Sequence, residues 1–588
     1  MCDPNDYRHT QYTVNTDVED ILKRIKPVSV LHVQIITELL EKVKLGSIDK
    51  SKFETYMIEL RRKHKIMLSK PDLLQALLSL GPHHSEYYLE IKELKKYLIL
   101  KSAKSLSGVL VITVITSPFP ENQDGTKQNF SCKYNCHFCP NEPGQPRSYL
   151  HDEPSVLRAN QNNFDAYLQF IDRAHTLETM GHEVTKIELL VLGGTWSSYP
   201  QYYRETYVRD LFYAANIYHD LPKERVRYSL AKEKLINENE SLCKIIGLTL
   251  ETRPDEITRQ AIIEFRYLGC TRIQLGLQHT DNAVLKKINR GHSIERAKQA
   301  IKMLKDACYK IDVHLMPNLP GSSPAQDDKM LNDILTDPDL QVDQLKIYPT
   351  SIVPWTKIAE WYASGEYKPY SYEELLEVLI KFKSHVNPWI RLNRIIRDIP
   401  SQYITDNTST PDMRNNLKVE MTKRSLRCQC IRCREIGPEE VENPQTVVYR
   451  YTGSGSKELF ISFETPEKRL VGFCRLRLPK ENGIFEELHN CALIRELHVY
   501  GKLKANYHVP DSTSNTQHHG FGLRLMRKAE EISQEHGFQM IAVISGIGVR
   551  NYYRKLGYKL ISGPSEMMVK YIVRDWYLCT CLYLIAFN

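Results

Sequence analysis

Residues 131–140 read SCKYNCHFCP, and this short stretch decides what kind of fold the rest of the chain builds. It places Cys132, Cys136 and Cys139 in a C-x3-C-x2-C spacing on one loop. Thiolates are soft ligands that select iron–sulfur clusters or zinc. A closed cluster or a structural zinc site takes four protein ligands, so three cysteines leave one metal position open. The spacing predicts a [4Fe-4S] cluster with one open iron; the alternative is a zinc knuckle with a distant fourth ligand.

Length and composition set the broad class of protein. A chain of 588 residues predicts two to four domains, and 42% hydrophobic with 26% charged residues is ordinary for a soluble globular protein. The net charge of +8 permits nucleic-acid binding without requiring it. The polar start MCDPNDYRHT indicates no secretory signal, and no apolar run is long enough to predict a membrane span. Clustered cysteines in such a chain favour metal chemistry in a reducing compartment, so we expect a cytoplasmic protein, with the nucleus as the alternative.

Strand and helix patterns alternate from about residue 107 to residue 400, as in a parallel β/α architecture. Helical patterns, for example Asn163–Met180 and Asp255–Leu268, lie between the apolar runs. The runs that predict strands are Val109–Ile115, Lys186–Leu192, Lys244–Leu250, Arg272–Leu277, Asp312–Met316 and Gln344–Tyr348. We therefore predict an α/β fold in which a partial (β/α)6 barrel follows an N-terminal helical region.

Small and polar residues follow each predicted strand, where a barrel of this kind keeps its active site. The second strand ends in the pair Gly193 and Gly194. Later strand ends supply the candidate cofactor contacts Glu251, Arg253, Gln274, Gln278 and His314. Each of these side chains could equally be a structural group at the barrel mouth.

A second cysteine set and an arginine-rich segment follow the barrel. The set is RCQCIRCREIG, with Cys428, Cys430 and Cys433 in C-x-C-x2-C spacing, which favours a structural Zn2+. The fourth ligand stays open, with His498 and Cys491 as candidates. The segment RLNRIIRDIP (Arg391–Pro400) predicts a phosphate-binding edge through Arg394 and Arg397, or else a surface linker.

The first hundred residues predict short helices with basic faces. Apolar and basic positions alternate at helical spacing over residues 18–65, and residues 84–105 predict a further helix. A basic helical face is ordinary solvated surface or a contact for an RNA backbone. The basic positions are Lys23, Arg24, Lys26, Arg61, Arg62, Lys63 and Lys65.

From about residue 445 the pattern becomes antiparallel β: VVYRYTG, ELFISFET, KRLVGFCRLRLP and CALIRELHVYG. The turn QHHGFG (517–522) then opens an amphipathic helix. The free amides at such a helix start favour a pyrophosphate. A strand (MIAVISG) and the segment VRNYYRKLGY follow, and this order resembles the acetyl-coenzyme A core of the GNAT acetyltransferases.

The first cysteine spacing resembles that of the radical S-adenosylmethionine (SAM) enzymes. Fused to a GNAT core, it resembles one family: the catalytic subunit of the Elongator complex with its archaeal, bacterial and viral relatives. The stretches that carry this resemblance are MGHEVTKIELLVLGGT, LTLETRPD, RIQLGLQHTDNAVLKKINRGH, LMPNLPG, LKIYPT, IRDIP, RELHVYG, QHHGFG and AVISGIGVRNYYRKLGY. The short gap between the first two cluster cysteines departs from the longer gap of eukaryotic members and indicates a divergent viral or protist branch. The tail after Tyr571 has no counterpart in the family.

The resemblance implies a tRNA-modifying enzyme that builds a carboxymethyl group on carbon 5 of the wobble uridine. It implies a [4Fe-4S] cluster and SAM as cofactors, acetyl-CoA as a substrate, the tRNA anticodon stem-loop as a partner, accessory subunits like those of Elongator, and no membrane. Gly193 and Gly194 would meet the methionine amino group of SAM. Lys186 of the barrel would act in the reaction, so the thioester would bridge the two halves, and Tyr552 or Tyr553 would protonate the leaving thiolate. The implied coenzyme contacts are Lys186, Glu496, Leu497, His498, Val499, Gly520, Phe521, Gly522, Leu523 and Tyr553.

Five regions follow from this interpretation: a tRNA-binding helical region (1–100), the barrel (101–400), a zinc-binding linker (401–440), the acetyl-CoA domain (441–571) and an atypical tail (572–588). Two other functions remain open at this point. One is a protein lysine acetyltransferase in which the radical domain is only structural. The other is a non-catalytic tRNA-binding scaffold.

Overall fold

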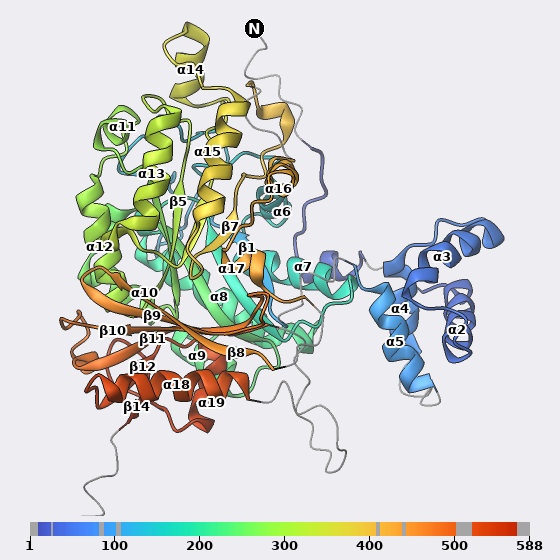
Figure 1. Cartoon of the computed structure of the whole chain (residues 1–588). Helices are drawn as coiled ribbons and strands as arrows, with labels where there is room; N and C mark the ends of the chain where they lie inside the picture. Colours follow the sequence, from blue (N-terminus) through green and yellow to red (C-terminus); the bar gives the residue numbers. More distant parts are fainter. Residues whose placement is uncertain are drawn as a thin grey trace, which may run out of the picture.

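Two seven-stranded sheets organise the chain (Figure 1). The computed structural model describes residues 10–24, 28–80, 87–100, 108–406, 412–437, 443–500 and 520–572. The predicted turn residues 517–519 and the tail 573–588 lie outside this range. Within the described residues, no helix combines the length and the apolar character that crossing a membrane needs.

The first sheet is parallel throughout, with its strands in sequence order from β1 to β7. Every residue of β4 is buried, as expected for a sheet covered by helices. The strands are β1 (Leu110–Ile115), β2 (Lys186–Leu192), β3 (Lys244–Thr252), β4 (Arg272–Gln278), β5 (Lys310–Leu315), β6 (Gln344–Ile347) and β7 (Arg391–Arg394). The helices between them are α6 (Pro154–Gln161), α7 (Ala166–Thr179), α8 (Gln201–Ile217), α9 (Leu230–Asn239), α10 (Arg259–Tyr267), α11 (Asn282–Lys287), α12 (Ile294–Asp306), α13 (Pro324–Thr336), α14 (Lys357–Ser364) and α15 (Tyr372–His385). The α/β prediction is confirmed.

A seventh strand extends the six predicted units. Residues Arg391–Arg394 form β7, which pairs in parallel with β6, so this part of the arginine-rich segment is a strand of the sheet and not a linker. Among the described strands, β1 and β7 are the two edges and do not pair with each other. The barrel is therefore open between β1 and β7.

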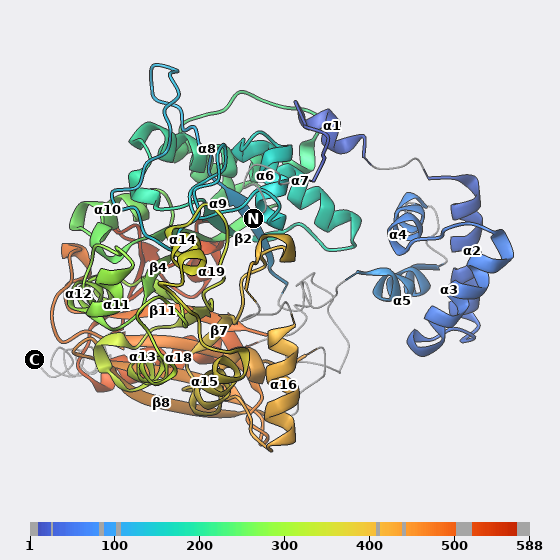
Figure 2. The same cartoon turned by 90° about the horizontal axis from the view of Figure 1, so that it is seen from above.

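The N-terminal helices fall into two parts: α1 packs against α7, and α2 to α5 form a separate bundle beside it (Figures 1 and 2). They are α1 (Val18–Leu22), α2 (Val30–Lys44), α3 (Lys50–His64), α4 (Lys70–Ser79) and α5 (Tyr88–Leu98). The basic faces are partly occupied, since Arg24 pairs with Asp172 of α7 at 3.0 Å and Lys63 pairs with Glu38 at 2.9 Å. Arg62 and Lys65 are exposed. The predicted helical region is present, and its basic residues serve both packing and surface charge.

The second sheet is mixed, in the order β13-β14-β12-β11-β10-β9-β8. Its first four strands in sequence form antiparallel pairs, and β11 and β12 are parallel. The elements are α16 (Met413–Lys423), α17 (Ile431–Arg434), β8 (Gln445–Gly453), β9 (Ser456–Glu464), β10 (Leu470–Leu478), β11 (Cys491–Val499), α18 (Phe521–Glu535), β12 (Met540–Val543), α19 (Arg550–Lys555), β13 (Lys559–Leu560) and β14 (Met568–Tyr571). Short 3-10 turns lie at residues 196–198, 218–220, 254–256, 338–340, 401–403, 486–488 and 547–549.

Buried ion pairs join the second sheet to the barrel. Arg495 of β11 binds both carboxylate oxygens of Asp343, which precedes β6, at 2.6 and 2.7 Å, and Arg475 lies 3.5 Å from the same carboxylate. All three side chains are at most 1% exposed. Removing one partner of such a pair costs about 3–5 kcal/mol, because it leaves the other charge buried and unpaired. The second sheet is thus fixed at the N-terminal end of the barrel strands, opposite the end that carries the first cysteine set.

Candidate active site

The three cysteines of the loop 131–140 line a small cavity of about 60 Å³ at the C-terminal ends of the strands. Gly194, Arg253 and Gln278 line the same cavity. Cys132 also contacts the Thr195 hydroxyl, with 3.2 Å between Sγ and Oγ1. Among the described residues, these three sulfurs do not form a group with all distances within 4.8 Å, whereas the second cysteine set does. Ligands to three different irons must stand further apart than ligands to one ion, so the spacing fits a cluster.

Two buried arginines hold Cys136. The Nη1 atoms of Arg253 and Arg290 each lie 3.4 Å from its Sγ. Burial alone would raise the pKa of this thiol, but the two guanidinium groups outweigh that effect and lower the pKa. The thiolate is the form that binds metal. Arg253, predicted as a cofactor contact, lines the cavity and also contacts Cys136. Arg290 escaped the sequence interpretation although it lies in the motif KKINRGH.

The backbone conformation just after β2 requires glycine at both positions. Gly193 and Gly194 have φ of +131° and +109°, a region that glycine adopts readily and other residues do not. A Cβ on Gly193 would lie 2.0 Å from the Thr116 hydroxyl, and one on Gly194 would lie 3.2 Å from the Phe130 ring. The pair therefore lets backbone amides reach the cysteine cavity without a side chain in the way.

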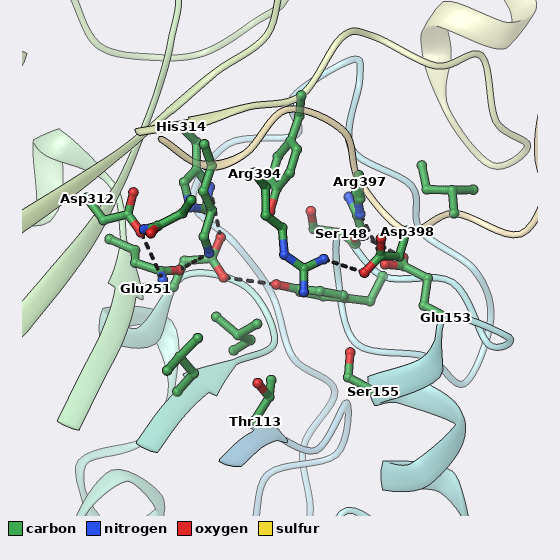
Figure 3. Close-up of a pocket in the computed structure, with 18 of the residues that line it drawn as sticks. Thr113, Ser148, Glu153, Ser155, Glu251, Asp312, His314, Arg394, Arg397 and Asp398 are labelled. Atoms are coloured by element: carbon green, nitrogen blue, oxygen red, sulfur yellow. Dashed lines mark hydrogen bonds and ion pairs between the residues drawn. The ribbon is translucent and has the colours of Figure 1, made fainter. Parts of the chain in front are cut away.

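A larger cavity of about 590 Å³ adjoins the first and runs through the open barrel. Glu251 and Gln278 line both cavities. Figure 3 shows Glu251, His314 and Asp312 on one side of it and Arg394, Arg397 and Asp398 on the other. Tyr149 donates to Glu251 at 3.0 Å, and His314 Nδ1 lies 3.6 Å from the same carboxylate.

Several buried polar atoms of this cavity have no hydrogen-bond partner among the described residues. They are Gln278 Oε1, His314 Nε2 and Asp312 Oδ1. Burial raises the pKa of Glu251, and burial together with nearby cations lowers the pKa of His314 well below its usual range. Unpaired buried polar groups are rare in folded proteins, so a polar ligand fits this space. Gln274 lies deeper, where its amide oxygen accepts from Lys346 at 2.8 Å.

The arginines of the segment 391–400 already have carboxylate partners. Arg394 Nη1 lies 2.5 Å from Asp398, and Arg397 binds both oxygens of Glu153 at 2.5 and 3.1 Å. Arg391 binds Glu435 at 2.8 Å. These guanidinium groups hold strand β7 and the loop after it in place, so the predicted phosphate-binding edge does not lie free.

The second cysteine set has the geometry of a single-ion site. The sulfurs of Cys428, Cys430 and Cys433 all lie within 4.8 Å of one another, and a tetrahedral zinc with sulfur bonds of about 2.3 Å needs such a spacing. Neither candidate for the fourth ligand belongs to this group. His498 instead packs between the Phe473 and Tyr500 rings, and Cys491 is buried at the start of β11, so both predictions of the fourth ligand are wrong.

The acetyl-CoA contacts implied by the family fall on β11 and the start of α18. β11 pairs with β12 only from Cys491 to Ile494, and the register on its other side shifts between Arg475 and Leu476. Beyond this bulge the strand carries Glu496, Leu497, His498 and Val499, with no strand paired on the β12 side in the described chain. Gly520, with φ of +146°, precedes α18, whose first turn contains Phe521, Gly522 and Leu523. A splayed strand facing a free helix start offers backbone donors and acceptors to an extended ligand.

Neighbouring tyrosines of α19 have different surroundings. The Tyr552 hydroxyl would lie 2.6 Å from a Cβ on Gly522, so it stands at the start of α18, and the residue is 40% exposed. Tyr553 is 7% exposed and packs in the core of the second sheet. Burial raises the pKa of both hydroxyls. The geometry favours Tyr552 over Tyr553 for proton transfer.

Lys186 is the first residue of β2, and every second residue after it (Glu188, Leu190 and Leu192) lines the large cavity. It therefore lies on the cavity side of the strand, at the end nearest the second sheet. Burial lowers the pKa of its ammonium group. Glu496 and His498 of β11 are close enough to Glu188 to affect its pKa, so this part of β11 lies near the same end of the barrel as Lys186.

The fold and the cysteine loop define a class: residues 130–334 match the Radical SAM superfamily, and residues 342–424 match the Radical_SAM C-terminal domain. Within that class, the chain is 37% identical to the tRNA uridine(34) acetyltransferase of Methanocaldococcus infernus over 544 residues, which cover 90% of this chain and 97% of that protein. It is 33% identical to Elongator complex protein 3 of Homo sapiens over 555 residues, which cover 90% of this chain and 95% of that protein. The solved structure of M. infernus Elp3 lacking residues 1–46 superimposes with a TM-score of 0.66 at 36% identity, covering 79% of this chain and all of that one.

The chain belongs to the family of the tRNA uridine(34) acetyltransferases and Elongator complex protein 3. The predicted resemblance is confirmed, and it extends over the barrel and the second sheet together. Membership of the radical SAM class implies a [4Fe-4S] cluster and SAM.

Proposed function

We propose that this chain modifies uridine 34 of tRNA by building a carboxymethyl group on carbon 5, with acetyl-CoA as the carbon source. The names of its relatives support the substrate. One observation carries the proposal: the large cavity reaches from the cysteine site to the end of the barrel where the second sheet docks. On this proposal, radical chemistry takes place at the cysteine end of the cavity, and the thioester binds at the second sheet beside its other end.

At the cysteine end, Cys132, Cys136 and Cys139 would hold three irons of a [4Fe-4S] cluster. With SAM bound, such a cluster supplies one-electron radical chemistry. The residues of the chain have supporting tasks. Arg253 and Arg290 would keep Cys136 ionised. The amides at Gly193 and Gly194 would contact the methionine part of SAM, and Glu251 and Gln278 would supply further polar contacts.

At the other end, the backbone of Glu496–Val499 and the first turn of α18, from Gly520 to Leu523, would hold acetyl-CoA. Lys186 would reach the thioester from the barrel side. The raised pKa of Tyr552 keeps its hydroxyl protonated at neutral pH. Tyr552 can therefore donate a proton to the thiolate that leaves when the thioester is hydrolysed.

The set Cys428, Cys430 and Cys433 would hold a structural Zn2+. Its backbone supports this task, because the Ile431 amide donates to the Ile390 carbonyl at 3.0 Å and so fixes the loop against the start of β7. A zinc ion there would stabilise the edge strand of the barrel rather than take part in the chemistry.

The experiment that tests this function is nucleoside analysis of tRNA by mass spectrometry. Reconstituted full-length protein with SAM, acetyl-CoA and a reductant should convert uridine 34 to carboxymethyluridine in unmodified tRNA. Omitting either SAM or acetyl-CoA should abolish the product. Acetylated lysine on added protein with no change in the tRNA would contradict the proposal and favour a lysine acetyltransferase.

A further inference from the structure

Three arginines of the large cavity differ from the others in lacking a carboxylate partner. The lining contains eight Lys or Arg side chains and five Asp or Glu side chains. Arg272, Arg391, Arg394 and Arg397 each pair with a carboxylate. In the part of the chain that the structure describes, Arg158, Arg173 and Arg432 form no ion pair. The cavity therefore carries uncompensated positive charge at three defined positions.

Arg158 and Arg173 form one half of this set, on the side of edge strand β1. Arg158 of α6 donates to the Thr113 carbonyl of β1 at 3.0 Å, and its Nε atom is buried with no partner among the described residues. Arg173 of α7 makes no hydrogen bond within the described chain. The nearest acid to Arg173, Asp172, is already taken by Arg24 at 3.0 Å and by Asn162 at 2.8 Å. Burial and, after it, the positive charge of Arg173 lower the pKa of Arg158 to about 10, so an anion between the two guanidinium groups would be favourable.

Arg432 forms the other half, on the side of edge strand β7. It lies in α17 between Cys430 and Cys433, and its Nη1 donates to the Asn393 carbonyl of β7 at 2.6 Å. The residue is exposed and lines the same cavity as Arg158 and Arg173. Because β1 and β7 do not pair, the three arginines stand on the two lips of the open side of the barrel.

The position of these charges fits an RNA strand rather than a small anion. A nucleotide that enters a cavity base-first leaves its two flanking phosphates at the mouth, one on each side. The N-terminal bundle with its basic helix α3 lies on the side of α7, next to the β1 lip (Figures 1 and 2). Arginine binds phosphate with two parallel hydrogen bonds.

We propose that Arg158 and Arg173 on the β1 lip, and Arg432 on the β7 lip, bind the two phosphodiesters that flank the uridine inside the cavity. This inference rests on the proposed function and names the residues that position its substrate. It also gives the second cysteine set a further role, since that loop presents Arg432 at the cavity mouth.

The test is RNA binding by the full-length chain, measured over a range of salt concentrations with an anticodon stem-loop that carries uridine 34. Arg173→Gln and Arg432→Gln should each weaken binding several-fold. Each should also reduce the slope of log affinity against log salt by about 0.7–0.9, as expected for the loss of one phosphate contact. Arg173→Gln should leave the melting temperature unchanged, because Arg173 has no partner to lose in the described structure. Arg424→Gln is the matched control, since that exposed arginine binds Glu377 outside the cavity.

A neutral methylphosphonate at one linkage beside uridine 34 sharpens the test. At the linkage that Arg173 contacts, Arg173→Gln should cause no further loss of affinity, whereas at the other linkage it should cause its full loss. Unchanged affinity and salt slope in Arg173→Gln and Arg432→Gln, while the wild type still modifies tRNA, would overturn this inference and leave the proposed function intact. Weakened binding of acetyl-CoA with unchanged RNA binding would overturn it too, by assigning the arginines to the coenzyme. A wild type that neither binds nor modifies tRNA would contradict the proposed function and this inference together.

Discussion

The two sets of three cysteines have similar sequence spacing and opposite surroundings. Cys132, Cys136 and Cys139 stand around a cavity, with two buried arginines on one thiolate. The sulfurs of Cys428, Cys430 and Cys433 lie within 4.8 Å of one another, on a loop that hydrogen-bonds to Ile390 just before edge strand β7. The difference in sulfur spacing and in neighbouring charge supports our proposal that the first set serves the chemistry and the second set serves stability.

The largest effect should come from the first set. Cys136→Ala should abolish both cluster assembly and tRNA modification, because Cys132 and Cys139 are the other two cysteines that line the cavity in the described chain and both are already ligands in our proposal. Iron content and the visible spectrum of anaerobically reconstituted protein measure this, and the melting temperature of the apoprotein serves as the control. A variant that retains iron and the cluster spectrum would show that the first set does not hold the cluster.

The second set should respond in the opposite way. Cys430→Ser should lower the free energy of unfolding by about 2–5 kcal/mol and release zinc, because a structural metal contributes folding free energy. Bound iron should be unchanged. Thermal unfolding combined with metal analysis would show this, and a variant of normal stability that had lost only turnover would make the second set catalytic.

The adjacent tyrosines show the same contrast, since we assign proton transfer to Tyr552 and core packing to Tyr553. Tyr552→Phe should slow thioester hydrolysis about 100-fold, at the lower end of what a general acid contributes. Tyr553→Phe removes a hydroxyl from a side chain buried in the core of the second sheet and should keep most of the rate. Rates of free coenzyme A release measure both, and equal rates in the two variants would refute the assignment.

The smallest effect tests the charge around the first set. Arg290→Gln keeps a polar side chain near Cys136 but removes one of the two cations that lower its pKa. We expect cluster affinity to fall about tenfold, the lower end for the loss of a group that supports a metal ligand. Titration of the apoprotein with iron and sulfide would measure it; an unchanged affinity would show that Arg253 alone suffices.

The sequence predicted those parts of the fold that local patterns encode. Strand β2 falls on the predicted residues Lys186–Leu192, because one apolar run of the right length lies between two helical patterns. Strand β7 escaped prediction because Arg391–Arg394 is short and carries two arginines, and only its pairing with β6 makes it a strand.

Side-chain partners were harder to foresee, since they depend on contacts distant in sequence. Arginine is a residue type that binds phosphate, yet the guanidinium group of Arg397 forms an ion pair with Glu153 from another part of the barrel. Arg290 could be found only once the fold brought it to Cys136, which lies 154 residues earlier. The motifs therefore located the site, and the paired or unpaired state of each charge came from the structure.

The central claim is that both ends of the barrel cavity serve one reaction on tRNA, and isotope transfer tests it most directly. With acetyl-CoA deuterated on its methyl group, the account predicts deuterium in the 5′-deoxyadenosine that forms in the presence of tRNA. Gly522→Leu should stop this transfer without changing the cluster spectrum, because a side chain there meets the Tyr552 hydroxyl at the start of α18. Unlabelled 5′-deoxyadenosine formed at the full rate from the deuterated thioester would contradict the account.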